Sequence, residues 1–198
     1  MIRTIAKSCC RAAAIVFVTP LVVSFHVKAL VIGRDPALHG STQTLAMAPG
    51  LIGRYLRVAF LRCTLSSCDP SAAVEFGTLF SRVDARIGKN VYIGPCCHIG
   101  LACIGDDVLV ASGVHIPSGA ETHGTARVDI SIREQAGQPK MVRIGAGSWI
   151  GSASVVMADV GQQSIVGAGA VVTRAIPEYS FAAGVPARVL HDRRAQAV

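Results

Sequence analysis

Residues 144–174 read IGAGSWIGSASVVMADVGQQSIVGAGAVVTR, and an apolar residue followed by glycine or another small residue recurs in them about every sixth position. A similar series occupies residues 87–116. The twelve apolar anchors are Ile87, Ile93, Ile99, Ile104, Val110, Ile116, Ile144, Ile150, Val156, Val160, Val166 and Val172. A period of six is typical of a β-helix, whose short strands end at corners that glycine can turn. At three anchors per turn, the series predicts an all-β solenoid of about four coils.

The position four residues after each anchor is small or β-branched, which predicts a second, narrower interior position. It is occupied by Val91, Cys97, Cys103, Val108, Val114, Ser148, Ser154, Ser164 and Ala170. This register predicts that Cys97 and Cys103 are small core residues rather than metal ligands. It also places His98 and His115 on the outer surface of the solenoid.

The composition indicates one folded domain with a short extension. The chain has 198 residues, of which 51% are hydrophobic and 16% charged, which argues against both a multidomain protein and a disordered polymer. Aromatic residues make up 5% and glycine numbers 20, which favours many short strands over a helical bundle. The seven cysteines form no Cys-x-x-Cys pair, which argues against a disulfide framework or zinc ribbon and favours reduced thiols in the cytosol.

Nearly all of the net charge of +7 lies in residues 1–70, which carry eight basic and two acidic side chains. Residues 12–25 of the same region are almost wholly apolar. An anionic membrane surface therefore explains the basicity better than nucleic acid does. The apolar run is shorter than the roughly 20 residues that span a bilayer, but it reaches that length at Ile32 if Lys28 snorkels. A signal peptide cleaved after Ala29 is the alternative.

A second segment, residues 51–65, has the pattern of an amphipathic helix, with Arg54 and Arg57 a turn apart. Its other face carries Leu51, Tyr55, Val58 and Leu61 or Leu65. Such a helix could lie on a membrane or cap the open end of a solenoid, and the sequence leaves both open. We therefore divide the chain into a helical, membrane-associated extension at residues 1–70 and a hexapeptide-repeat domain at residues 71–198.

A polar interruption at residues 117–143 separates the two stretches of repeat. A loop of this length that leaves a regular solenoid usually carries function. The loop contains His123, which is therefore a candidate catalytic residue.

Three motifs follow the interruption: WIGS at residues 149–152, VGAGAVVTR at 166–174 and AAGVPARVL at 182–190. With the repeat and the histidine-bearing loop, they closely resemble the left-handed parallel β-helix acyltransferases, which include the maltose and galactoside O-acetyltransferases. The acetyltransferases of bacterial exopolysaccharide and surface-glycan synthesis, of the colanic-acid type, are closer still. The resemblance covers about residues 76–190. The N-terminal third more loosely resembles the membrane-associated leader of polysaccharide acetyltransferases.

This resemblance implies a homotrimer that binds acetyl-CoA, or a longer acyl-CoA, in a groove between two subunits. A histidine would take the proton from the acceptor hydroxyl, which attacks the thioester without a covalent enzyme intermediate. His123 resembles the loop histidine of the sugar acetyltransferases, although the stretch from Ile104 is slightly longer here, and His115 is the second candidate base. The backbone N–H of Ser152 would stabilise the oxyanion. Asp129 could orient the loop histidine or bind sugar hydroxyls, or be an ordinary polar loop residue.

For the cofactor, the resemblance places Trp149 beside the CoA arm and the backbone of Ala168 on the pantetheine. Thr173, Arg174 and Arg188 match the region that meets the adenine nucleotide and its phosphates, for which arginine is well suited. No metal is expected.

The expected function is acetyl-CoA-dependent O-acyl transfer to a sugar hydroxyl in exopolysaccharide or surface-glycan biosynthesis. The expected location is the cytoplasmic face of the inner membrane, or the cytoplasm, with no nucleic-acid partner. One alternative is a non-catalytic trimeric scaffold docked on a membrane. Another is the zinc-dependent hydratase of the same fold, which needs three converging histidines and usually a His-x-x-x-x-His pair. The sequence has no such pair.

Overall fold

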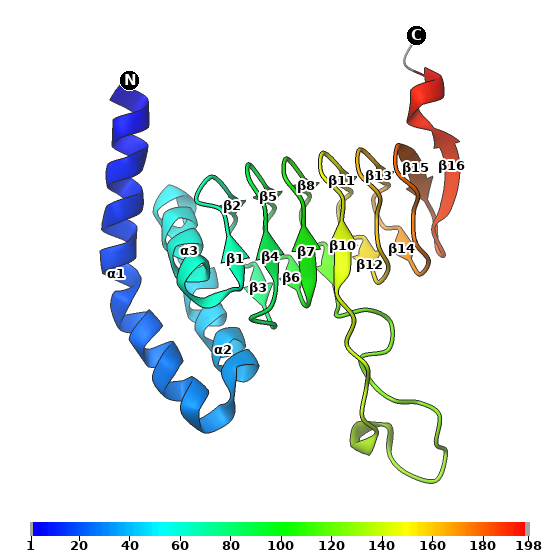
Figure 1. The fold of residues 1–198 in the computed structure, drawn as a ribbon, viewed down its shortest axis with the longest axis horizontal. Coiled ribbons are helices and arrows are strands. Elements are labelled where there is room, and N and C mark those ends of the chain that lie inside the picture. The colour runs from blue at the N-terminus through cyan, green and yellow to red at the C-terminus, as the bar shows by residue number, and fades with distance from the viewer. Residues whose placement is uncertain (1, 197–198) are drawn as a thin grey trace.

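The structure, a computed structural model, describes residues 2–196 of the chain. Three helices come first, α1 (Ile2–Ile32), α2 (Arg34–Ala46) and α3 (Gly50–Thr64). A solenoid of short strands follows, with its coils stacked from the helices toward the C-terminus (Figure 1). The strands are β1 (Ser67–Cys68), β2 (Ala73–Val74), β3 (Leu79–Phe80), β4 (Arg86–Ile87), β5 (Tyr92–Ile93), β6 (His98–Ile99), β7 (Ala102–Ile104), β8 (Leu109–Val110), β9 (His115–Ile116), β10 (Val142–Ile144), β11 (Trp149–Ile150), β12 (Val155–Val156), β13 (Ile165–Val166), β14 (Val171–Val172), β15 (Ser180–Ala183) and β16 (Arg188–Asp192). Two short 3₁₀ helices are η1 (Ile132–Glu134) and η2 (Arg193–Gln196).

The strands form three sheets, one for each face of a three-sided prism. Face A holds β1, β4, β7 and β10; face B holds β2, β5, β8, β11, β13 and β15; face C holds β3, β6, β9, β12 and β14. Neighbouring strands on a face are parallel and come from successive coils. Among the described strands, β16 alone pairs antiparallel, with β15. The parallel β-helix predicted from the six-residue period is confirmed, and its hexapeptide repeats fit the left-handed form.

Most strands bury an anchor together with a small residue two positions before it. Cys97 precedes the anchor Ile99 in this way and is fully buried, and its thiol donates to the carbonyl oxygen of Ala111 at 3.1 Å, so its predicted core role is confirmed. The prediction for Cys103 is wrong. Cys103 lies half-buried on the outer side of β7, and Ala102 takes the interior position. The second interior position always lies two residues before the next anchor. Because Ile99 and Ile104 are five residues apart instead of six, that position falls at Ala102 and not at Cys103.

The glycines that follow the anchors have a different role from the one expected. A Cβ at Gly145 or Gly151 would lie less than 3.0 Å from backbone atoms of the next coil, whereas neither residue is among those with positive φ. The left-handed corner position lies two residues later, for example at Gly147 and Ala153. Glycine after an anchor is therefore needed because successive coils approach closely there, and the corner itself is turned elsewhere.

The solenoid has about six coils on faces A and B, more than the four predicted. The first coil begins at Ser67, just before the proposed division at residue 70, and its buried positions include Val74 and Phe80. Late in the chain, Ile176 continues face A and Ala182 is buried on β15. These residues lie outside the Ile-Gly and Val-Gly pattern, so the count of anchors was too low.

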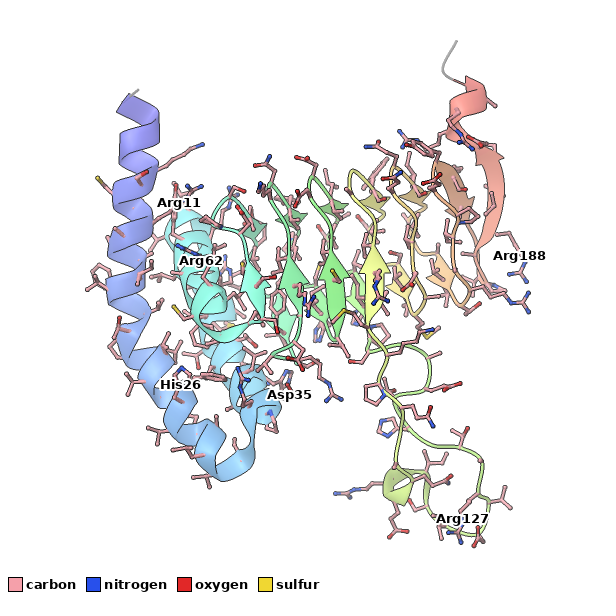
Figure 2. All side chains as sticks on the ribbon, in the orientation of Figure 1. Arg11, His26, Asp35, Arg62, Arg127 and Arg188 are labelled. Carbon is pink, nitrogen blue, oxygen red and sulfur yellow. The ribbon has the colours of Figure 1, made fainter. Side chains whose placement is uncertain are left out.

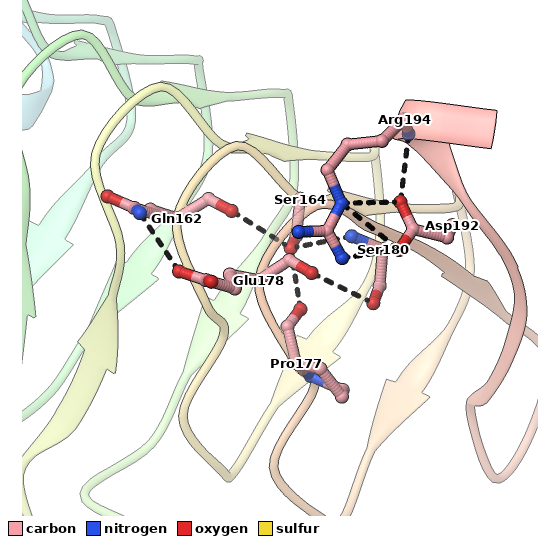
Figure 3. A network of polar contacts seen from close by, with 7 residues as sticks. All are labelled: Gln162, Ser164, Pro177, Glu178, Ser180, Asp192 and Arg194. Carbon is pink, nitrogen blue, oxygen red and sulfur yellow. Dashed lines mark hydrogen bonds and ion pairs between the residues drawn. The ribbon is translucent and has the colours of Figure 1, made fainter. Parts of the chain in front are cut away.

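A ladder of buried serines joins successive coils at the corner between faces A and B. The hydroxyl of Ser148 donates to the carbonyl oxygen of Gly161 at 2.8 Å and accepts the N–H of Ser164 at 3.1 Å. Ser164 in turn donates to the carbonyl oxygen of Pro177 at 2.8 Å and accepts the N–H of Ser180 at 3.1 Å (Figure 3). Each hydroxyl thus satisfies one buried donor and one buried acceptor.

The three helices close the N-terminal end of the solenoid. α1 runs across this end, and α3 lies between α1 and the first coil (Figure 1). One face of α1 buries Ala14, Val18 and Phe25, and the rest of its surface leaves Phe17 and Leu30 77% and 89% exposed. α3 buries Val58, Phe60 and Leu61 among others, so it acts as the cap that the sequence left as one of two alternatives.

Arg57 of α3 holds this cap together. It is 3% exposed, and its guanidinium donates to the carbonyl oxygens of Val74 at 2.9 Å, Leu45 at 3.1 Å and Ala48 at 2.7 Å. Burial lowers the pKa of Arg57, against the opposing influence of Glu75. Arg57 therefore does not share an outer basic face with Arg54, because its donors satisfy carbonyl groups at the end of α2 and on β2.

Candidate active site

Face C and its two flanking corners bring most of the predicted site residues together. The outward side chains along this face are Leu79, His98, His115, Val155 and Val171, one for each successive coil. The corner from face B precedes each of these strands, and the corner to face A follows it. A ligand lying on face C could therefore contact both corners and the outward column between them.

Two histidines stack in this column. The ring centroids of His98 and His115 are 4.8 Å apart and their planes are 7° from parallel. They line a cavity of about 290 Å³ with His39 of α2. The pKa of His98 is lowered from its ordinary value, first by burial and then by the proximity of His115 and His39. A lowered pKa favours the uncharged ring, which can accept a hydrogen bond from a hydroxyl.

Sequence reasoning assigned His98 only to the outer wall and gave His39 no role. One signal was available: His98 and His115 are 17 residues apart with Ile99 and Ile116 as matching anchors, so they occupy the same outward position of successive coils. No signal in the repeat could have placed His39 there, because it arrives from the helical cap.

His123 lies in the excursion between β9 and β10, which projects away from the prism (Figure 1). The two limbs of the excursion are joined by backbone hydrogen bonds from Gln138 to Glu121 at 2.7 Å and from Lys140 to Ser118 at 2.8 Å. The side chain of His123 is exposed. His115 is also exposed but belongs to a strand of face C, so the two candidate bases occupy different environments.

A groove of about 550 Å³ separates the base of the excursion from the corner between faces C and A. Thr173 and Arg174 line it from the solenoid, and Glu121 and Lys140 line it from the excursion. Two of the three residues assigned to the nucleotide end of CoA, Thr173 and Arg174, thus lie beside an open groove.

Ser152 and Ala168 lie on the opposite flank of face C, at the corner from face B in adjacent coils. Gly169 donates to the carbonyl oxygen of Ser152 at 2.8 Å, which fixes the two corners against each other. Within residues 2–196, the hydrogen bonds of this corner leave the N–H groups of Ser152 and Ala168 without an acceptor. Both donors are therefore available to a ligand such as a thioester oxygen or an amide carbonyl.

The remaining predicted cofactor residues are more widely separated. Trp149 is 49% exposed on β11 of face B, three residues before Ser152. Arg188 is on β16, beyond the stacked coils, and its side chain points away from the solenoid (Figure 2). Within one described chain, Arg188 and the excursion therefore do not line the same pocket.

Asp129 pairs with Arg127 at the far end of the excursion, and this hydrogen bond lowers the pKa of the Asp129 carboxyl. It is therefore engaged with Arg127 in the excursion. Over the described part of the chain, no group of three His, Cys, Asp or Glu side chains has the arrangement of a metal site, including the three histidines of the face C cavity.

Known proteins are similar to this chain in sequence and in fold. A family described as the hexapeptide repeat of succinyl-transferase matches residues 141–174. The chain is 30% identical over 172 residues to the galactoside O-acetyltransferase of Escherichia coli K12, which covers 74% of this chain and 82% of that protein.

Solved structures share the fold. A maltose O-acetyltransferase from Clostridium difficile 630 is 22% identical with a TM-score of 0.66, over 78% of this chain and 86% of its own. A galactoside acetyltransferase in complex with coenzyme A is 22% identical with a TM-score of 0.56, over 82% and 84% of the two chains. The chain therefore belongs to the family of hexapeptide-repeat acetyltransferases.

Proposed function

We propose that this acetyltransferase transfers an acetyl group from acetyl-CoA to a hydroxyl of a sugar in exopolysaccharide or surface-glycan synthesis. The observation that carries this proposal is the arrangement on face C, with free backbone donors on one flank, stacked imidazoles in the outward column and the excursion on the other flank. The galactoside and maltose O-acetyltransferases, which are similar over most of the chain, support a sugar acceptor.

In the proposed reaction, a neutral imidazole accepts the proton of the acceptor hydroxyl. His123 is the preferred candidate for this base, and His115 is the alternative. The oxygen then attacks the thioester carbonyl, and the N–H of Ser152 stabilises the negative oxygen of the tetrahedral intermediate. Collapse of the intermediate breaks the carbon–sulfur bond, and the proton passes from the imidazolium to the CoA thiolate. The His39, His98 and His115 cavity supplies a place for the sugar, since uncharged imidazoles hydrogen-bond hydroxyl groups.

The function is tested with the full chain in detergent or nanodiscs, supplied with acetyl-CoA and a panel of sugar acceptors. We expect ester formation with release of one CoA thiol per acetyl group transferred. A scaffold would show no binding of acetyl-CoA by calorimetry. A zinc-dependent hydratase would turn over without acetyl-CoA and lose activity with a chelator, and either result would overturn the proposal.

We also propose that the chain acts as a homotrimer. Face B carries an outward apolar column in which Leu109 and Trp149 are 44% and 49% exposed, and Ile165 and Phe181 continue it in register. A contiguous apolar column of this kind is typical of a surface that another chain covers. The excursion with His123 also extends beyond its own prism, so a neighbouring subunit could complete the site (Figure 1).

Leu109→Asp should dissociate this trimer, because it would bury an unpaired carboxylate in the apolar column. Native mass spectrometry should show a trimer for the unaltered chain and monomer for the variant, with a large loss of turnover. Ile52→Asp, at an exposed apolar position of α3, is the matched control and should remain trimeric. If the unaltered chain were monomeric and fully active, the proposed trimer would be wrong.

Finally, we propose that residues 1–70 hold the enzyme at the cytoplasmic face of a membrane and are retained in the mature protein. Lys7–Ile32 of α1 is long and apolar enough to cross a membrane. The burial of Ala14, Val18 and Phe25 of α1 against the other two helices supports retention, since cleavage would expose α2 and α3. Acetyl-CoA, the donor, is a cytosolic metabolite.

A further inference from the structure

A basic cavity lies between α1, α3 and the corner of the first coil, on a different side of the helical cap from the histidines. Its volume is about 440 Å³. The cations Lys7, Arg11, Arg54 and Arg62 line it, and Tyr55 and Val58 contribute to its apolar wall. Figure 2 shows Arg11 and Arg62 near each other, between α1 and α3. Neither the proposed reaction nor the fold uses these four charges together.

The positive charge of this cavity is only partly neutralised. Within residues 2–196, Arg54 alone of the four cations has an ion-pair partner, Glu75. Asp69 is near Arg11 and Lys89, which help to lower its pKa, but hydrogen bonds from Ser71 are the main cause. The Nε atoms of Arg11 and Arg54 are shielded from solvent and have no hydrogen-bond partner in the described chain. Guanidinium N–H donors that are shielded from water and have no acceptor favour an anionic ligand.

The cavity also lies beside an exposed apolar surface. α1 contacts α2 and α3 with one face, while Val16, Phe17 and Leu30 are more than two-thirds exposed on the other. Because α2 and α3 pack along α1, a membrane-crossing α1 would draw both helices into the bilayer. If α1 instead lies parallel to the membrane surface, α2 and α3 stay out of the bilayer. The basic cavity is then at the depth of the lipid headgroups.

The geometry points to a binding site for the phosphate of an anionic phospholipid in this cavity. The guanidinium groups of Arg11 and Arg62 would contact the phosphate, with Lys7 adding charge, and the apolar wall would accept the start of the acyl chains. Occupancy would orient the prism with its first coil toward the membrane. The inference rests on the proposed membrane seat of residues 1–70 and is independent of the acceptor.

The test compares binding of the full chain to vesicles of phosphatidylcholine with and without anionic phosphatidylglycerol. The variant is Arg11→Gln with Arg62→Gln. The matched control is Arg86→Gln with Arg143→Gln, which removes the same charge from exposed positions of face A. We expect the cavity variant to bind anionic vesicles roughly 10- to 30-fold more weakly, at about 1 kcal/mol per basic residue, and the control to lose much less.

Equal losses in the two variants would show general attraction to a charged surface and would overturn a built site, as would no loss in the cavity variant. If millimolar inorganic phosphate competes fully with anionic vesicles, free phosphate is the ligand and the lipid assignment is wrong. Lys7→Gln with Arg62→Gln is a second variant if the first fails to fold. Acetyl transfer to a soluble sugar should be unchanged in the cavity variants, so a lipid result is separable from failure of the proposed reaction.

Discussion

Replacement of His123 by alanine is expected to lower turnover roughly 10²- to 10⁴-fold, the usual contribution of a positioned general base. Affinity for acetyl-CoA should change little, because the proposed contacts to the cofactor come from Ser152, Ala168 and the groove at Thr173 and Arg174. Steady-state kinetics with a calorimetric titration of acetyl-CoA separate the two effects.

Two further variants make this measurement specific. Thr125→Ala removes an exposed side chain from the same excursion and should leave turnover near that of the unaltered chain. His115→Ala should weaken acceptor binding more than turnover, since His115 lines the cavity proposed for the sugar. If His115→Ala abolishes turnover and His123→Ala spares it, the base is the face C histidine.

Gly145→Ala should be among the most damaging substitutions of a single small residue in the solenoid. A Cβ at Gly145 would lie less than 3.0 Å from backbone atoms of Gly161 and Gln162, which have no flexible side-chain end that could move away. We expect a loss of about 3 kcal/mol in the free energy of unfolding, at the upper end of overpacking effects. That loss corresponds to a fall of roughly 6–12 °C in melting temperature for a chain of this size.

Gly40→Ala provides the control for this change. Gly40 lies within α2, and a Cβ there would meet no atom within 4 Å. Alanine should therefore stabilise the helix by up to about 1 kcal/mol. A Gly145→Ala protein as stable as the Gly40→Ala protein would show that the coils can separate without cost, contrary to the close approach described above.

The repeat made the architecture predictable because every anchor occupies the same kind of buried position on a strand. The period of Ile144, Ile150 and Val156 identified the coils, but it did not identify which residue shares the interior with each anchor. Counting forward from Ile99 gave Cys103, whereas the structure counts back from Ile104 to Ala102. An irregular spacing therefore changes the register of the residues before an anchor and leaves the anchor in place.

The helical extension was predictable in part. Apolar periodicity indicated the helices, but a pattern of charges could not reveal that Arg57 points inward to three carbonyl groups. That role depends on where the end of α2 meets β2, which is a tertiary contact. Amphipathic patterns assume that arginine stays in water, and this assumption fails where one guanidinium satisfies several backbone acceptors.

The candidate site was predictable where motifs carried it and unpredictable where separate elements meet. Ser152, Ala168, Thr173 and Arg174 lie at the corners that flank face C, whereas Trp149 lies on face B. The stack of His98 on His115 and the approach of His39 were not foreseen, because they join a strand column to a helix 59 residues earlier than His98. The position of His123 relative to the acceptor depends on the proposed neighbouring subunit.

Because the coils stack on the helical cap, the distance from the cap to the candidate active site on face C is fixed. Each coil adds about 4.8 Å along the prism, and the outward column of face C from His98 to Val171 extends from the second coil to the fifth. With α1 in the membrane surface as proposed, acetyl transfer would take place roughly 5–20 Å above the first coil. The number of coils would then act as a ruler that selects sugars by their distance from the bilayer, and lengthening the solenoid would move the chemistry to a more distant sugar.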